Sequence, residues 1–308
     1  MEKTLAAQVL CEVRKAVVGK DEVLAKALLA ILAGGHILLE DIPGVGKTTM
    51  ALAFSKALGL QYRRVQFTPD VMPSDLTGFS IWNKETGGME YQPGALLCNL
   101  FLADELNRAT SRTQSALLEA MEEGQVTVDG VSRRVPSPFL VVATQNPAGA
   151  SGTQLLPDSQ LDRFMVRLSL GYPGAAEEVV MLRRKQEGNP LDTVVQVTDA
   201  AGLEAERRAV ERVYLSDEVA QYVVELVVAT RNHPLVAQGG SPRATLAVAA
   251  MSRAAAHVQG RDYVVPGDVK AVFRDTVDHR ILLTGRGASG GADPVGEILS
   301  AVKPPRLG

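Results

Sequence analysis

A short glycine-rich loop between an apolar strand and a helix constrains this chain more than any other feature. Residues 36–39 form a short apolar run, the following loop holds Gly44 and Gly46, and residues 49–58 have a helical pattern. A strand, a glycine loop and a helix in this order predict a βα unit whose loop turns backbone N–H groups inward to bind phosphate. The N-terminus of the helix would add its dipole to that site. A Gly-Lys turn without a ligand is the alternative, and the order of the three elements argues against it.

Side chains suited to phosphate and metal binding follow the glycines directly. Lys47 supplies a cation for the terminal phosphates of a nucleotide, and Thr48 supplies a hydroxyl beside Mg²⁺. The strict form of this loop begins with glycine, whereas this chain has Asp41. That position begins the loop and does not itself contact phosphate, so we expect nucleotide binding all the same. The expected nucleotide-binding residues of the loop are Pro43, Gly44, Val45, Gly46, Lys47, Thr48 and Thr49.

Short apolar runs separated by helical segments predict an α/β fold in the first part of the chain. Uninterrupted runs of this kind are typical of strands that are buried on both faces of a parallel sheet. They predict a doubly wound sheet with up to five strands. The expected strands are residues 36–39, 65–67, 100–103, 139–143 and 166–169.

The pattern changes near Tyr172, after which helices follow one another almost without strands. The expected helices are residues 175–187, 200–212, 217–231, 243–258 and 267–283. We therefore expect two domains, an α/β domain at residues 1–171 and a helical domain at residues 172–308. Residues 285–294 are rich in glycine and predict a flexible link.

Two segments of the first domain predict β-hairpins. Residues 79–94 are polar and aromatic with two glycines in the middle, which indicates a small hairpin inserted into a helical region. Residues 125–135 alternate around an Asp-Gly pair, a strong signal for a two-residue hairpin turn. Trp82 and Tyr91 of the first hairpin have two interpretations, contact with a client protein or burial beneath the insertion.

Two carboxylates follow the apolar strand at residues 100–103. The carboxyl ends of parallel strands form the edge where ligands bind in open α/β sheets. Asp104 could hold Mg²⁺ through water, and Glu105 could orient or deprotonate the attacking water. A solvated turn is the alternative for such a pair on its own. Its position downstream of Lys47, in the expected order, favours the metal and catalytic roles.

Two further polar residues continue this order. Asn146 comes after the apolar strand at residues 139–143 and could hydrogen-bond the γ-phosphate or the attacking water, although an Asn-Pro pair also favours turns. Arg163 could reach the γ-phosphate of a neighbouring subunit and stabilise the charge of the transition state. The alternative for Arg163 is a surface ion pair with Asp158 or Asp162.

Arg243 occupies an unusual place at the start of a predicted helix. Ser241 and Pro242 precede it as an N-cap and a first helical residue. Cations are disfavoured in the first turn of a helix because of the helix dipole. A locally unfavourable residue indicates a functional reason, which here would be contact with phosphate across a domain cleft.

Charge and composition argue against several classes of protein. The chain has 35 acidic and 32 basic residues and a formal net charge of −3, whereas a dedicated nucleic-acid binder usually has a basic excess. No stretch approaches the ~18 apolar residues of a membrane span, and the N-terminus lacks the features of a signal peptide. Cys11 and Cys98 match no metal spacing, which indicates two free, buried thiols in a reducing compartment. We therefore expect a cytoplasmic protein.

The motifs and the sequence that connects them resemble the MoxR family of AAA+ ATPases. The resemblance covers most of the chain, about residues 15–283, and its combined motifs are highly specific. The segments that carry it are residues 34–40, 66–70, 73–78, 104–109, 114–123, 144–147 and 160–164.

The resemblance implies an αβα core with a parallel five-stranded sheet, an all-α lid, and a hexameric ring that binds ATP or ADP with Mg²⁺ between subunits. Residues 79–94 would then be the family's insertion in the second core helix. It implies catalytic roles for Glu105, for Asn146 as first sensor, for Arg163 as the trans-acting arginine and for Arg243 as second sensor; phosphate and metal roles for Lys47, Thr48 and Asp104; and an adenine-side role for Val18 and Gly19.

The resemblance also implies a function. MoxR-like proteins are chaperone-like machines that mature clients or insert metal cofactors, commonly with a partner that has a von Willebrand A (VWA) domain. One alternative is a nucleic-acid motor or chelatase-like motor subunit on the same core, and the low positive charge argues against nucleic acid. The other is a nucleotide switch that does not hydrolyse ATP, and the presence of both Glu105 and Asn146 argues against it.

Overall fold

The computed structural model of the chain describes residues 4–146, 156–289 and 291–306. Its contacts divide the chain into two compact units. The first unit comprises Met1–Leu24, His36–Leu156 and Ser169–Glu204, and the second comprises Ala25–Gly35, Pro157–Leu168 and Ala205–Gly308. The domain limits expected at residues 171 and 172 stay a prediction, while contacts group the segment Ser169–Glu204 with the first unit.

A five-stranded sheet with the order β2-β5-β8-β1-β9 forms the centre of the α/β fold. Its strands are β1 (Ile37–Glu40), β2 (Tyr62–Gln66), β5 (Leu100–Asp104), β8 (Leu140–Gln145) and β9 (Val166–Leu168). Strands β2, β5, β8 and β1 pair in parallel, with Leu102 opposite Arg64 on one side and Val142 on the other. Every residue of β5 and β8 is buried, as expected of central strands with both faces covered. The predicted parallel sheet is confirmed.

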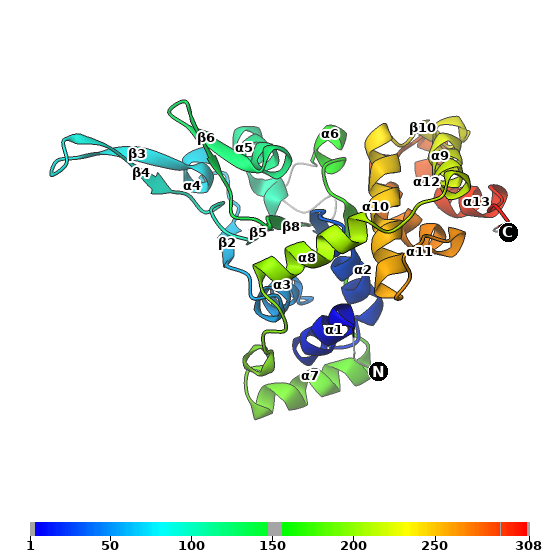
Figure 1. The fold of residues 1–308 in the computed structure, drawn as a ribbon, viewed down its shortest axis with the longest axis horizontal. Coiled ribbons are helices and arrows are strands. Elements are labelled where there is room, and N and C mark those ends of the chain that lie inside the picture. The colour runs from blue at the N-terminus through cyan, green and yellow to red at the C-terminus, as the bar shows by residue number, and fades with distance from the viewer. Residues whose placement is uncertain (1–3, 147–155, 290, 307–308) are drawn as a thin grey trace. The chain divides into compact units, whose positions relative to one another are not determined.

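Helices with well-defined starts surround the strands of the first unit (Figure 1). Thr4 caps α1 and Thr110 caps α5, each with a side-chain oxygen that accepts a backbone N–H. Helix α1 buries Val9 and Val13 and packs against α3. The helices of this unit are α1 (Leu5–Ala16), α3 (Lys47–Ala57), α4 (Pro73–Thr77), η1 (Leu106–Arg108), α5 (Ser111–Glu123), α7 (Ala175–Glu187) and η2 (Pro190–Thr193), while α2 (Asp21–Leu32) and α8 (Ala200–Glu211) have residues in both units.

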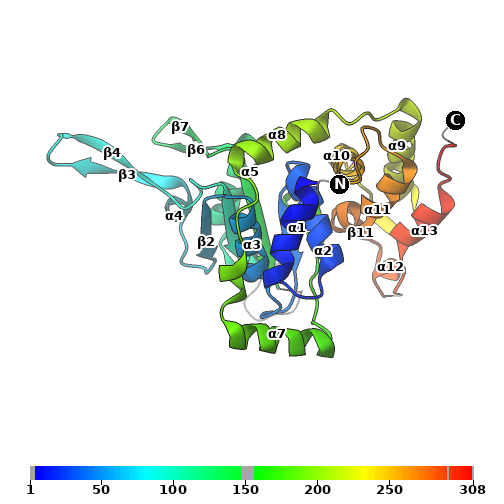
Figure 2. The same ribbon diagram turned by 60° about the horizontal axis from the view of Figure 1, so that its bottom comes forward.

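Both predicted hairpins are present, and the longer one extends away from the sheet (Figures 1 and 2). They are formed by β3 (Gly78–Asn83) with β4 (Gly88–Pro93), and by β6 (Gln125–Val128) with β7 (Val131–Arg134). Trp82 is 61% exposed, so burial beneath the insertion is wrong for this residue. Tyr91 is half-buried, its hydroxyl donates to the carbonyl of Thr77, and the guanidinium of Arg133 lies 3.9 Å from its ring centroid.

The second unit packs helices around an apolar core. Val219, Tyr222 and Leu226 of α9 meet Val248 and Phe273 from the two neighbouring helices. Besides β9 and the shared helices α2 and α8, the elements of this unit are α6 (Asp158–Leu161), α9 (Asp217–Asn232), β10 (Val236–Gln238), α10 (Pro242–Val258), α11 (Pro266–Val277), η3 (Asp278–Arg280), β11 (Leu282–Leu283), α12 (Gly285–Ser289) and α13 (Pro294–Ala301). Across the described ranges of both units, no helix is long and apolar enough to cross a membrane.

The end of the chain differs from the sequence expectations in two places. The helix expected at residues 267–283 stops at Val277, because the chain turns through η3 and β11 pairs antiparallel with β10. The link expected at residues 285–294 contains the short helix α12, which the hydroxyl of Thr284 caps by accepting the backbone N–H of Gly287 at 3.3 Å.

Candidate functional site

The glycine-rich loop runs from β1 into α3 with the backbone that its glycines permit. Gly44 and Gly46 have φ values of 86° and 99°, in the left-handed region that residues with a Cβ rarely adopt. Gly46 is the N-cap of α3 and has no side chain to bond the first N–H groups of the helix. Those N–H groups are therefore available to an anion, which also gains from the helix dipole. The loop has the geometry of a phosphate site.

Lys47 is the cation of this loop and is 8% exposed. Its Nζ donates a hydrogen bond of 2.7 Å to the carbonyl oxygen of Asp41. Burial lowers the pKa of Lys47, while the charges of Asp41, Asp104 and Glu105 act in the opposite direction. A desolvated cation that faces carboxylates is well placed for a phosphate, which would replace the carbonyl as its partner.

Thr144 and Asn146 each hold one of the two carboxylates by a hydrogen bond. Thr144 Oγ1 donates to Asp104 Oδ1 at 2.7 Å and accepts the backbone N–H of Glu105 at 2.8 Å. Asn146 Nδ2 donates to Glu105 Oε1 at 3.3 Å. Glu105 has a φ of 56°, an uncommon conformation for a non-glycine residue that is found at functional turns. Pro147, the next residue of the Asn146 motif, lies outside the described residues.

Two arginines that the sequence reasoning missed pair with these carboxylates. Arg64 Nη2 donates to Asp104 Oδ2 at 2.7 Å, and Arg108 Nη1 donates to Glu105 Oε2 at 2.9 Å. Arg64 lies on β2, whose register with β5 places Gln66 opposite Asp104. The signal in the sequence was weak: Arg64 and Gln66 are two residues apart, so they share one face of a strand. Only the strand order shows that this face borders the carboxylates.

One cavity of about 400 Å³ brings most of the expected phosphate, metal and catalytic side chains together. It is lined by Pro43, Gly44, Gly46, Lys47, Thr48, Thr49, Arg64, Gln66, Asp104, Glu105 and Asn146. Hydroxyl and carboxylate oxygens are ligands that Mg²⁺ prefers. Within the described ranges, no group of three His, Cys, Asp or Glu side chains could hold a metal by itself. Two protein oxygen donors, from Thr48 and Asp104, fit an ion that takes its other ligands from phosphate and water. Val45 belongs to the loop but is not part of this lining.

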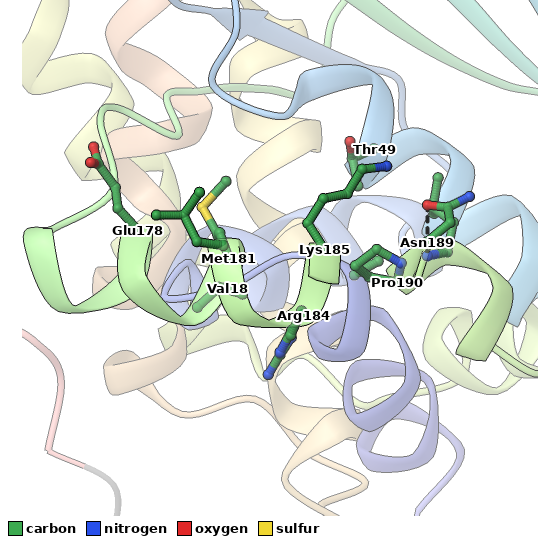
Figure 3. A pocket seen from close by; sticks show the side chains of 11 residues that line it. Val18, Thr49, Glu178, Met181, Arg184, Lys185, Asn189 and Pro190 are labelled. Carbon is green, nitrogen blue, oxygen red and sulfur yellow. Dashed lines mark hydrogen bonds between the residues drawn. The ribbon is translucent and has the colours of Figure 1, made fainter. Parts of the chain in front are cut away.

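A second pocket of about 480 Å³ shares Thr49 with the first cavity. Its walls come from the end of α1, the start of α3 and the length of α7, with Val18 and Met181 among the apolar side chains (Figure 3). Gly19, next to Val18, has a φ of 70°, and a Cβ there would fall 1.8 Å from Glu177 Oε1. The left-handed backbone favours glycine at this position. The pocket is large enough for a heterocyclic base.

Arg163 and Arg243 both lie in the second unit. A hydrogen-bond network joins Asp162, just before Arg163, to Ser241, two residues before Arg243. Asp162 accepts hydrogen bonds from Ser241 Oγ at 2.9 Å and from Arg280 Nη1 at 3.1 Å. Ser241 also caps α10 by accepting the backbone N–H of Arg243 at 3.1 Å. Burial lowers the pKa of Arg280 to about 10, with Asp162 opposing and Arg243 adding to the shift. The roles of Arg163 and Arg243 toward a nucleotide stay predictions.

Two protein-family models match this chain. A model described as the ATPase family associated with various cellular activities (AAA) matches residues 36–166. A model of the AAA lid domain matches residues 228–300. The first range contains the glycine-rich loop and the side chains of the 400 Å³ cavity, and the second range contains Arg243.

Named relatives and a solved structure match almost the whole chain. The uncharacterized protein YeaC of Bacillus subtilis is 45% identical over 95% of this chain and 92% of its own length. The chaperone MoxR1 of Mycobacterium tuberculosis is 38% identical over 89% of this chain and 74% of its own. A crystal structure of a predicted ATPase from Cytophaga hutchinsonii superposes with a TM-score of 0.91 at 36% identity, over 99% of this chain and 96% of that one.

Proposed function

The chain belongs to the MoxR family of AAA+ ATPases, and from this premise we propose that it uses Mg²⁺-dependent ATP hydrolysis in a ring of identical subunits to remodel a client protein. One observation carries the proposal: Lys47, Asp104, Glu105 and Asn146 face a single cavity at the end of the sheet. A cation, a metal-side carboxylate, a candidate base and a group that orients this base are the parts that phosphoanhydride hydrolysis needs.

The residues of the cavity have separate tasks in the proposed reaction. Lys47 and the first N–H groups of α3 bind the β- and γ-phosphates and stabilise the charge that develops on them. Glu105 orients the attacking water and takes its proton. Asn146 and Arg108 hold the two oxygens of this carboxylate, so it enters the reaction in one orientation. The products are ADP and phosphate.

The metal site consists of the Thr48 hydroxyl and Asp104. Mg²⁺, when bound, neutralises negative charge on the β- and γ-phosphate oxygens. Thr144 fixes one oxygen of Asp104 by a 2.7 Å hydrogen bond, so the carboxylate is oriented before any ligand arrives. Thr48 lies in the first turn of α3, directly after the phosphate-binding lysine.

We assign the adenine base to the pocket beside Val18 and Gly19. This pocket and the phosphate cavity share Thr49, so one nucleotide could extend through both. Apolar side chains such as Val18 and Met181 suit the faces of a planar base.

A ring, with six subunits as the family implies, would complete the site. In the proposed ring Arg163 reaches the γ-phosphate of the adjacent subunit, and Arg243 contacts phosphate as the sensor of the lid. The network through Asp162 supports this pairing of roles, because it links the turn before Arg163 to the helix start before Arg243.

The proposed client work follows from the family. The relative from Mycobacterium tuberculosis is named a chaperone, which supports protein remodelling as the use of the ATPase cycle. We include in the proposal a VWA-domain partner, maturation of a metal cofactor in the client, and a cytoplasmic location, where ATP and reduced thiols are found. Cys98 is buried as expected, whereas the expected burial of Cys11 is wrong, because this thiol is exposed.

A mixing experiment tests the ring mechanism. Lys47→Ala subunits lack a working cavity and keep Arg163, whereas Arg163→Ala subunits keep the cavity and lack the arginine. Alone, the Arg163→Ala protein should lose about 10³-fold of its turnover, as other trans-acting arginines do. Mixed in equal amounts, roughly a quarter of the interfaces in a ring would join an intact cavity to an intact arginine, and turnover should recover accordingly.

The control for mixing uses two affinity tags. If both variants purify in one assembly and the mixture turns over no more ATP than the two proteins measured separately, Arg163 does not act between subunits. Wild-type turnover per subunit should also rise with protein concentration, because the active site forms only on assembly.

A further inference from the structure

Arg64 is a cation of the nucleotide cavity that comes from a neighbouring strand and from none of the sequence motifs. Its Nε and Nη2 both donate to Asp104 Oδ2, at 3.2 and 2.7 Å. The side chain of Asp104 is 12% exposed, and its other oxygen accepts the hydroxyl of Thr144 at 2.7 Å. Both oxygens of the expected metal-side carboxylate therefore have protein partners.

The charge of Asp104 explains why such a partner is present. A largely buried carboxylate is unfavourable unless a positive charge or several hydrogen bonds compensate for its lost hydration. A guanidinium with two N–H groups on one oxygen supplies both kinds of compensation. A divalent cation near the same carboxylate would supply the same compensation and make the arginine unnecessary.

We propose that Arg64 is a positioning residue that holds Asp104 until metal and nucleotide bind, and that its guanidinium competes with the divalent cation for Asp104 Oδ2. This inference rests on the proposed function, because it concerns the metal requirement of the same site. If Arg64 competes with the metal, the Arg64–Asp104 ion pair helps to set how strongly nucleotide binding depends on the metal, together with the metal ligands themselves.

The surroundings of Arg64 allow the exchange. Its side chain is 45% exposed, so it can move away from the carboxylate at little cost in burial. Nη2 also donates to Gln66 Oε1 at 2.9 Å, which keeps a partner for the guanidinium when Asp104 Oδ2 is given up. Both Arg64 and Gln66 line the 400 Å³ cavity, so the positive charge stays close to the phosphates.

Two opposite effects on ADP binding follow from this competition. Without metal, Arg64 adds positive charge to the cavity, so its removal should weaken the binding of ADP. With metal, removal of Arg64 takes away a competitor for Asp104, so ADP binding should be kept or strengthened. Each effect is worth about a factor of two to five for a partly exposed ion pair.

The experiment measures the Kd of ADP by calorimetry, once with excess Mg²⁺ and once with EDTA. The readout is the ratio of the Kd in EDTA to the Kd in Mg²⁺. In Arg64→Gln this ratio should rise by roughly twofold, when binding in Mg²⁺ is only kept, to about 25-fold, when both effects reach a factor of five. Arg64→Lys keeps the positive charge but loses the paired hydrogen bonds from Nε and Nη2 to Asp104 Oδ2, so its ratio should rise less than that of Arg64→Gln.

Arg63→Gln is the matched control, because it makes the same substitution one residue earlier on the same strand. Arg63 Nη1 donates to the carbonyl of Gly94 at 3.1 Å, and Arg63 is not part of the cavity lining. Its ratio should equal that of wild type.

A general structural disturbance would weaken ADP binding under both conditions, so both Kd values would rise by a similar factor and their ratio would stay unchanged. An unchanged or lower ratio in Arg64→Gln therefore overturns the inference. If that variant does not fold, Arg64→Lys decides, since a ratio equal to wild type would contradict competition. Failure of the wild-type protein to bind ADP in Mg²⁺ would refute the proposed function instead.

Discussion

Asp41 Oδ1 accepts a hydrogen bond from the backbone N–H of Gly171 at 3.0 Å. The same carboxylate also accepts the backbone N–H of Leu170 and, at 2.8 Å, the hydroxyl of Ser169. Asp41 is 5% exposed. The first residue of the glycine-rich loop therefore fastens the loop to the segment that leads into α7. Glycine at this position, as in the strict loop pattern, could not make these bonds.

Replacing Asp41 by glycine should destabilise the protein although it restores the strict loop pattern. Three hydrogen bonds to a buried carboxylate would be lost, and two backbone N–H groups would lose their partner, for a cost of about 2–4 kcal/mol in the free energy of unfolding. Asp41→Asn keeps the size and one acceptor oxygen, so it should cost less. Urea denaturation of wild type, Asp41→Asn and Asp41→Gly gives their free energies of unfolding, which should fall in that order. An Asp41→Gly protein as stable as wild type would show that the contacts of Asp41 do not stabilise the fold.

Removal of the buried cation Arg280 should strongly destabilise the second unit. Its side chain is 3% exposed and pairs with Asp162, which is 19% exposed. Arg280→Met would leave this carboxylate without its counter-charge, at a cost of about 3–5 kcal/mol.

The matched control is Arg167→Met, whose pair with Asp278 is more exposed, at 31% and 44%. It should cost about 1 kcal/mol or less. Denaturant titrations give the free energy of unfolding that each variant loses. Equal losses in Arg280→Met and Arg167→Met would contradict the expectation that the buried ion pair contributes more to stability than the exposed one.

His279 should make the stability of the protein sensitive to acid. It is 4% exposed, its Nε2 lies 3.0 Å from the carbonyl of Phe164, and burial together with Arg280 lowers its pKa to about 3. An unfolded histidine titrates near pH 6.5, so between pH 6.5 and about 3 the unfolded chain binds the extra proton. This contribution to stability is therefore fully present above pH ~6.5 and falls as the pH decreases.

His279→Gln keeps a donor for Phe164 and removes the titration. Below pH ~6.5 wild type should lose stability faster than this variant, by up to about 1.4 kcal/mol per pH unit. The test measures the free energy of unfolding of both proteins at roughly pH 7.5, 6.0 and 5.0 and compares how steeply it falls with pH. Parallel slopes would mean that His279 is not held neutral in the fold.

Trp82 is the only tryptophan of the sequence and reports on the β3–β4 hairpin. Because it is 61% exposed, its fluorescence in the isolated protein should resemble that of a solvated indole, and acrylamide should quench it almost as well as in the unfolded chain. Trp82→Phe should change stability by no more than about 0.5 kcal/mol. Weak quenching in the native protein would show that the hairpin is covered, by a second subunit or by another protein.

Local spacing explains why much of the cavity could be predicted. The glycines, Lys47 and Thr48 are adjacent in sequence, and Asp104 and Glu105 directly follow an apolar strand. Each of these patterns depends on neighbours along the chain, where geometry is set by the strand and the helix themselves.

Other parts depend on contacts between distant segments. Arg64 reaches Asp104 only because β2 lies next to β5 in the sheet. Asp41 gains its partners from a segment about 130 residues later. The helix α12 was missed because glycine composition outweighed the cap from Thr284. For Arg64 and Asp41 the deciding partner is distant in the sequence, whereas the cap of α12 is local and joins residues three positions apart.

Calorimetric titration of ATP with Mg²⁺ into the Glu105→Gln protein tests the central claim most directly. This variant keeps every phosphate-binding group and loses the base, so we expect one ATP bound per chain and no release of phosphate. Lys47→Ala in the same titration should bind at least about tenfold more weakly. Absence of ATP binding to Glu105→Gln and to wild type, or equal affinity in Lys47→Ala, would contradict the account.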